Sequence, residues 1–187
     1  MNRLEKDAVL AHLITALRNK GSWCGETHIQ KCAFFLEELT ERPLGFNFIL
    51  YKHGPYSFDL TDELASMRAF GYLNWEVLST QFGPRLKATA DKSKLSEYAA
   101  EVEKLKPALD FIVSKLSQLG VASLERFSTA LFFTSKDKIE DVEARAQKIC
   151  AVKPHIPIEK AREAVFTVEE ILKEWAAAKV EPKLVAV

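Results

Sequence analysis

The chain has 187 residues, which is long enough to bury a real hydrophobic core in one domain, or in one domain with an appendage. Its 26 Lys and Arg residues equal its 26 Asp and Glu residues, so bulk charge does not support a dedicated nucleic-acid binder. No apolar run reaches membrane-spanning length, and three cysteines without a secretory signal indicate a reducing interior. We therefore expect a soluble cytoplasmic protein with no membrane partner.

Two amphipathic helices are predicted first. Residues 3–20 repeat leucine and isoleucine at the i, i+3, i+4, i+7 spacing, and Gly21 ends the segment. Residues 26–41 repeat the pattern, and Pro43 stops the second helix.

A strand, a turn and a third helix are predicted next. Residues 46–51 alternate bulky apolar side chains with others, which predicts a strand with one strongly buried face. Gly54 and Pro55 are expected to turn the chain, with backbone freedom needed at the glycine. Ser57 then caps a predicted helix over residues 57–70.

Two more strands, over residues 72–77 and 85–89, form a predicted hairpin around a Gly-Pro turn. This hairpin would be the wing of a winged helix-turn-helix. The order of strand, turn, helix and hairpin between residues 46 and 89 is the sequence's strongest indication of fold.

The remainder is predicted to be helical over four segments, 91–118, 123–133, 138–150 and 157–178. Gly120 marks the seam between a winged-helix-like domain with a long helix, residues 1–119, and a C-terminal helical extension, residues 120–187. The predicted fold class is α+β and mainly helical, a winged helix-turn-helix module with a C-terminal helical extension.

Five motifs carry a family resemblance: Thr27–Leu36, Phe46–Tyr51, Gly54–Ser57, Gly71–Leu73, and the segment from Leu124 to Phe133. They resemble prokaryotic YwgA-like proteins and, more distantly, the Panacea-type domains found beside toxins. Two positions differ from the family pattern, because His53 stands where tyrosine is frequent and Ile29 replaces leucine. The resemblance implies a winged-helix-like fold and a regulatory or defence-associated, antitoxin-like setting. It implies no catalytic residue.

Cys24, His28 and Cys32 are spaced i, i+4, i+8, and thiolate and imidazole groups are good zinc ligands. However, Gly25 is expected outside the helix, a fourth ligand is missing nearby, and Cys32 suits an apolar core. The sequence also lacks a phosphate-binding loop and the common hydrolase motifs. We therefore expect no metal, no cofactor and no enzymatic activity.

The helix that would enter a DNA groove starts with Asp59, Asp62 and Glu63, which phosphates would repel. These acids also suit the positive end of a helix dipole, so a purely structural role explains them.

A small basic patch is predicted on the wing. It is formed, against Asp91, by Arg85, Lys87, Lys92 and Lys94, and it would lie adjacent to Lys52 and His53. Such a patch is able to touch a phosphate backbone, and the alternative is a solvated hairpin tip.

Aromatic residues near the turn and the hairpin are candidate anchors for a partner protein: Tyr56, Phe58, Trp75 and Phe82. Core packing is the alternative for each, above all for Trp75, which alternates with Leu73 and Val77. We expect Phe58 and Phe82 to be exposed.

An apolar seam follows the predicted helix over 91–118, with its members alternately four and three residues apart: Leu95, Tyr98, Val102, Leu105, Leu109, Ile112, Leu116 and Leu119. The seam predicts a homodimer or, alternatively, packing on the protein's own core. Pro107 favours a break in the helix.

The function that these features favour is a non-enzymatic regulatory or interaction module of a prokaryotic cytoplasm that acts by binding a partner macromolecule, with a partner protein as the first expectation. The alternative is a winged-helix DNA-binding transcription regulator, for which we expect weak, salt-sensitive binding.

Overall fold

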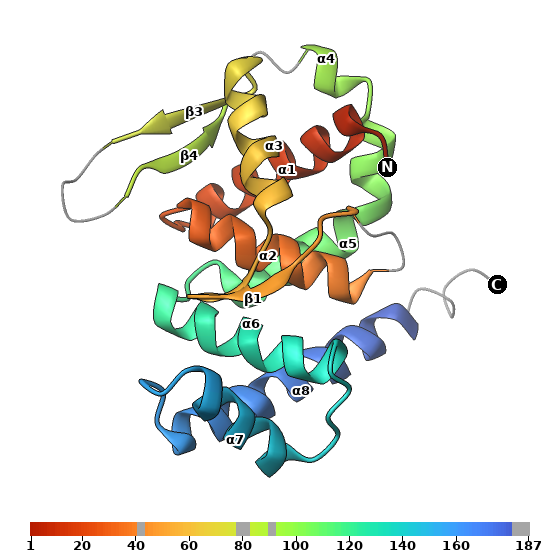
Figure 1. The fold of residues 1–187 in the computed structure, drawn as a ribbon. Helices are drawn as coiled ribbons and strands as arrows, with labels where there is room; N and C mark the ends of the chain where they lie inside the picture. The colour runs from red at the N-terminus through yellow and green to blue at the C-terminus, as the bar shows by residue number, and fades with distance from the viewer. Residues whose placement is uncertain (41–43, 78–82, 90–92, 181–187) are drawn as a thin grey trace.

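The computed structural model describes residues 1–40, 44–77, 83–89 and 93–180, and Figure 1 shows their arrangement. Helices form most of this part of the chain, and two antiparallel β-hairpins are inserted among them. The predicted mainly helical α+β class is therefore confirmed. Within these ranges, no helix combines the length and the apolar character needed to cross a membrane.

The first two helices, α1 (Arg3–Asn19) and α2 (Glu26–Leu39), lie where the apolar spacing predicted them. α1 starts with a capping box, in which the side chains of Asn2 and Glu5 each bind the other residue's backbone amide. Gly21, with φ +83°, turns the chain just after α1. Both helices contribute deeply buried apolar side chains to one core.

The first hairpin joins β1 (Ile49–Tyr51) to β2 (Gly54–Tyr56). Lys52 and His53 form its turn, so the prediction that Gly54 and Pro55 turn the chain was wrong. Gly54 instead pairs with Tyr51 and has φ +84°, the left-handed conformation that returns the chain from a turn into an antiparallel strand.

The third helix, α3 (Phe58–Ala69), follows this hairpin directly. Ser57 caps it as predicted, because its hydroxyl accepts a hydrogen bond from the amide of Leu60 at 3.2 Å. Leu60, Leu64 and Met67 are buried, so the predicted inward face is confirmed.

The second hairpin pairs β3 (Leu73–Glu76) with β4 (Arg85–Ala88), close to the predicted ranges. It packs on α1 and projects from the body of the molecule beside α3 (Figure 1). A backbone bridge joins Gly25, immediately before α2, to Arg85 on β4. The segment between α1 and α2 therefore lies antiparallel to β4 and extends this hairpin by one bridge.

The predicted helix over 91–118 is divided into α4 (Ser93–Ser96) and α5 (Ala99–Leu116). Pro107 lies inside α5 and does not break it, contrary to the prediction. Proline removes the amide that would bind the carbonyl of Glu103, four residues earlier. Both residues are exposed, so water is available to that carbonyl.

The apolar seam along α5 packs inside the protein. Leu105, Leu109, Ile112 and Leu116 are buried, and α5 packs against both α1 and α2. The core alternative is therefore correct, and a homodimer through this seam is ruled out while the fold is intact.

Three helices complete the described fold: α6 (Val121–Ser135), α7 (Val142–Val152) and α8 (Ile158–Val180). The N-cap of α6 is Gly120, so the helix begins two residues before the predicted segment over 123–133. α6 packs on α2 and β2 on one side and on α7 and α8 on the other (Figure 1). The division into residues 1–119 and 120–187 stays a prediction.

Asp7, on α1, has a fully buried carboxyl group, and its effect on the free energy of unfolding depends on pH. Burial raises the pKa of Asp7 to about 7, and the carboxylate of Glu63 on α3 adds to the increase. An aspartate in the unfolded chain has a pKa of about 3.9. Between these values the folded state binds more protons, so the free energy of unfolding should fall as the pH rises from about 4 to about 7.

The Asp7→Asn variant should lose this fall and, at about pH 8, should have a free energy of unfolding about 1–3 kcal/mol above wild type. Urea unfolding at several pH values measures the difference. Asp62→Asn, at an exposed position on α3, is the matched control and should keep the wild-type pH dependence. The same pH dependence in Asp7→Asn as in wild type would contradict the role given to the buried carboxyl group.

Candidate partner-binding surface

The predicted site residues lie in two separate places. Lys52, His53 and Tyr56 belong to the β1–β2 hairpin, which packs on α2 and α6, and Phe58 opens α3 beside it. Arg85 and Lys87 lie on β4, which packs on α1. The residues of the predicted basic patch are thus divided between two hairpins, and a single surface formed by them stays a prediction. Phe82, Lys92 and the side chain of Lys94 lie outside the part of the chain that the structure describes.

An exposed cluster of three rings covers the β1–β2 hairpin and the start of α3. The ring centroids of Tyr51, Tyr56 and Phe58 lie 5.1–5.8 Å apart, and two of the three pairs meet edge to face. Tyr51 is 45% exposed and Phe58 is 53% exposed, so the predicted exposure of Phe58 is confirmed. Ile49, also exposed, pairs with Tyr56 across the hairpin and extends the cluster. We call these four residues the aromatic surface.

The alternation within residues 46–51 explains why this surface exists. Phe46 and Phe48 point into the core, as predicted, so Ile49 and Tyr51 at the intervening positions face outward. Sequence reasoning identified Tyr56 and Phe58 but did not select Ile49 and Tyr51. The same period of two would have found them.

The hydroxyl group of Tyr56 holds its ring in place. It lies 2.6 Å from Oγ1 of Thr61 and donates to Oε1 of Glu26 at 3.2 Å, which connects the hairpin to α3 and α2. Burial raises the pKa of the Tyr56 phenol, and the hydrogen bond to Thr61 opposes the increase. The ring is therefore a neutral, oriented group at neutral pH.

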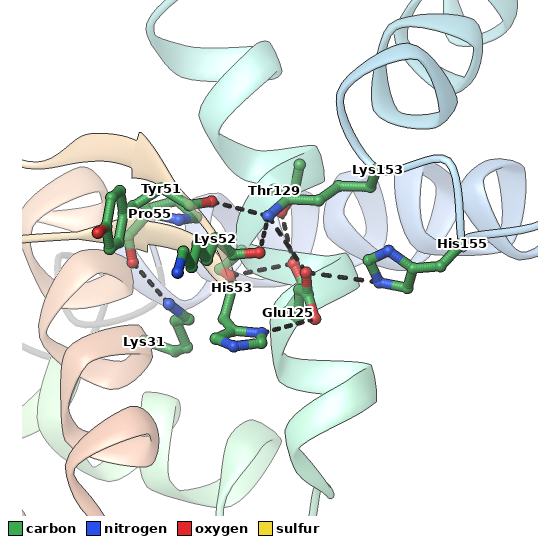
Figure 2. Close-up of polar contacts among 10 residues, drawn as sticks. Lys31, Tyr51, Lys52, His53, Pro55, Glu125, Thr129, Lys153 and His155 are labelled. Carbon is green, nitrogen blue, oxygen red and sulfur yellow. Dashed lines mark hydrogen bonds and ion pairs between the residues drawn. The ribbon is translucent and has the colours of Figure 1, made fainter.

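Two buried lysines hold the backbone of the hairpin, one from α2 and one from the end of α7 (Figure 2). Nζ of Lys31, on α2, donates to the carbonyl of Pro55 at 2.7 Å. Nζ of Lys153, at the end of α7, donates to the carbonyl of Tyr51 at 2.7 Å and also to that of Lys52. Burial lowers the pKa of Lys31 to about 8.

Glu125 on α6 supplies the negative charge at the centre of this network (Figure 2). Its buried carboxylate lies 3.3 Å from Nζ of Lys153 and 3.7 Å from one ring nitrogen each of His53 and His155. Buried charges are costly unless they are paired and hydrogen-bonded. The three groups Lys31, Glu125 and Lys153 therefore form one unit, which we call the lysine–glutamate network.

The basic residues of the β3–β4 hairpin surround a carboxylate. Oxygens of Glu76 lie 3.3 Å from both Arg85 and Lys87, and 2.9 Å from Arg18 on α1. The predicted basic character of this hairpin is thus reduced by an acidic residue that the sequence reasoning left out. On α3, Asp59 and Asp62 remain exposed.

Trp75 is 50% exposed, so the core-packing alternative is wrong for this candidate anchor. β3 starts in the core with buried Leu73 and then leaves the body of the protein, so Val77 is exposed as well. The guanidinium of Arg68 lies 3.4 Å from the centroid of the Trp75 ring and covers part of it.

The cysteines and His28 are used inside the fold. Gly25 is the N-cap of α2, so Cys24 precedes the helix and does not share the face of Cys32. Burial raises the pKa of both thiols. The two ring nitrogens of His28 lie 3.0 Å from Ser22 Oγ and from the carbonyl of Leu116. In the described ranges, no three His, Cys, Asp or Glu side chains gather in a way that would hold a metal ion.

Compared with known proteins, the chain matches no protein-family model and no curated protein at a significant level. The resemblance to YwgA-like proteins stays a prediction from the motifs. Functional inference therefore depends on the geometry of the surfaces described above.

Proposed function

We propose that the protein is a non-enzymatic regulatory module of a prokaryotic cytoplasm and binds a partner protein through the aromatic surface. The observation that carries this proposal is the exposed three-ring cluster of Tyr51, Tyr56 and Phe58 on a hairpin held by buried charges. The antitoxin-like setting implied by the motif resemblance fits a protein whose activity is to bind another protein.

The energetics of binding favour this surface. Large aromatic side chains dominate the binding energy of protein interfaces, and an anchor that is already ordered loses little conformational entropy on binding. The lysine–glutamate network fixes the backbone under Tyr51 and Lys52, and Glu26 fixes the ring of Tyr56. A pre-ordered aromatic group of this kind is a suitable hot spot.

We also propose that the fold is a winged helix, which the order α1, α2, α3 and then β3–β4 supports. The bridge from Gly25 to Arg85 places a third short strand-like segment at the hairpin edge, where a winged helix has its first strand. Arg18, Arg85 and Lys87 outnumber Glu76 there, which favours DNA as the second candidate ligand. The exposed carboxylates of Asp59 and Asp62 oppose reading of bases by α3, so such binding should be weak and salt-sensitive.

The test compares three baits: wild type, the double variant Tyr51→Ser/Phe58→Ser, and Phe166→Ser. Phe166 is similarly exposed, on α8, and serves as the matched control. Proteins captured from an extract of the source organism are quantified, and the one that distinguishes the baits is purified and titrated by calorimetry. The double variant should bind it about 30-fold or more weakly, as expected for hot-spot loss near 2 kcal/mol.

Equal capture of every protein by wild type and the double variant would contradict the proposal. A protein that is lost equally with Phe166→Ser would show a general loss of fold rather than of the surface. Light scattering of the purified chain shows whether the partner is a second copy. Fluorescence anisotropy with duplexes at about 50 mM and about 200 mM salt tests the DNA alternative, and tight binding to one sequence would favour it.

A further inference from the structure

A cavity of about 730 Å³ lies between the segment that precedes α2, the β3–β4 hairpin, and the junction of α5 with α6. Its volume falls within the range of about 300–1,000 Å³ that is typical of small-molecule sites. Trp23 and Trp75 line it from two different segments, together with Leu86 and Leu119. Most of its lining is therefore apolar, and two of its residues carry indole rings.

Both indole groups have positions set by the protein. Nε1 of Trp23 donates to the carbonyl of Gly83 at 3.1 Å, which ties the first ring to the β3–β4 connection. The Arg68 guanidinium packs on the ring of Trp75 at 3.4 Å. Because the rings are held before any ligand enters, a planar guest would not have to order them.

The segment before α2 is strained and tightly bonded. Cys24 has φ +57°, a left-handed conformation that non-glycine residues rarely adopt. Its amide donates to Ser22 Oγ at 3.0 Å, and its carbonyl accepts from the amide of Leu86 at 2.9 Å. Such strained positions cluster at ligand sites, where the surrounding structure maintains them. Here the strain lies between Trp23 and Gly25, both of which line the cavity.

The described lining offers no positive charge to an anionic guest. Burial lowers the pKa of His28, and its ring nitrogens already contact Ser22 and the Leu116 carbonyl, so it contributes no positive charge. Glu26 is the one formally charged side chain among the described lining residues. Its Oε1 accepts hydrogen bonds from Tyr56 and Thr61. The described lining holds no cationic side chain for an anionic ligand, and the one carboxylate oxygen named already accepts two hydrogen bonds, which favours an uncharged guest.

We propose that this cavity binds an uncharged, planar small molecule of two or three fused aromatic rings, in contact with Trp23 and Trp75. Stacking on aromatic faces suits such a molecule, and the side chains of Leu86 and Leu119 would cover part of its edges. The inference does not depend on the partner-binding function, because it concerns a different set of residues.

Fluorine NMR of the full chain labelled with fluorotryptophan tests the proposal, because the protein has three tryptophans. The probe is β-naphthol, and its fully hydrogenated analogue has the same carbon skeleton and hydroxyl group without the aromatic rings. β-Naphthol should shift the signals of Trp23 and Trp75 to saturation, with a Kd below about 1 mM. Trp175, which packs on Phe111 at 5.3 Å, should not shift.

Two comparisons decide the outcome. The hydrogenated analogue should bind at least about tenfold more weakly, and Trp23→Leu or Trp75→Leu should weaken β-naphthol by about fivefold or more. Retention of the Trp175 signal shows that each variant is folded. Equal affinity for the two probes, unchanged affinity in both variants, or no saturation at Trp23 and Trp75 would overturn the proposal.

Discussion

Replacing Gly54 with alanine should lower the free energy of unfolding by about 2–4 kcal/mol. Two effects add at this position. Gly54 has φ +84°, which strains any residue with a Cβ atom. A Cβ atom there would also lie 2.9 Å from Oγ1 of Thr129, 3.0 Å from Oγ of Ser128 and 3.3 Å from the carbonyl oxygen of Glu125. The backbone of β2 therefore approaches α6 at a distance that only glycine allows.

Gly71→Ala separates the two effects. Gly71 has φ +76°, and an added Cβ atom would meet nothing within 4 Å, so the control variant carries the conformational cost without the clash. It should lose only about 1–2 kcal/mol. Chemical denaturation of both variants measures the difference. Equal losses at the two positions would show that the close approach of β2 to α6 does not contribute to stability.

Short-range patterns predicted much of this fold. The period of two in residues 46–51 correctly placed Phe46 and Phe48 in the core, and the helix over 57–70 and the hairpin after it were found within one or two residues. These features depend on residues that are close together in the sequence, so the sequence alone is enough to predict them. The predicted turn at Gly54 failed because a glycine with positive φ is used both within turns and immediately after them.

Long-range contacts explain what the sequence could not show. Lys31, Glu125 and Lys153 come from three helices or their ends, and no spacing rule connects them. Lys31 lies in the Thr27–Leu36 motif. A lysine in a helix is normally predicted to be exposed to solvent. Core packing was the stronger alternative for Trp75, because Trp75 alternates with Leu73 and Val77, but β3 leaves the body of the protein after Leu73.

Removing the charge of Glu125 should have a still larger effect than Gly54→Ala. The Glu125→Gln variant should lose about 3–5 kcal/mol of unfolding free energy, because it leaves the buried amino group of Lys153 without the carboxylate that pairs with it. The pKa of Lys31 should also change in this variant. The carboxylate of Glu125 now opposes the lowering of the Lys31 pKa by burial, so its loss should lower that pKa further.

Removing both charges tests whether they act as a unit. The double variant Glu125→Gln/Lys153→Met should be about 1–3 kcal/mol more stable than the sum of the single effects predicts. The control is Glu163→Gln, which breaks an exposed pair with Lys160 and should lose no more than about 0.5 kcal/mol.

Hydrogen exchange gives a local measurement of the same network. Amides of the β1–β2 hairpin should exchange faster in Glu125→Gln than in wild type. The ion pair with Glu125 keeps Lys153 in the position from which it donates to the carbonyls of Tyr51 and Lys52. The aromatic surface would then lose the fixed backbone on which its proposed binding depends. Additive single effects, together with unchanged exchange in the hairpin, would show that the two charges are independent and that the hairpin is held by its apolar contacts alone.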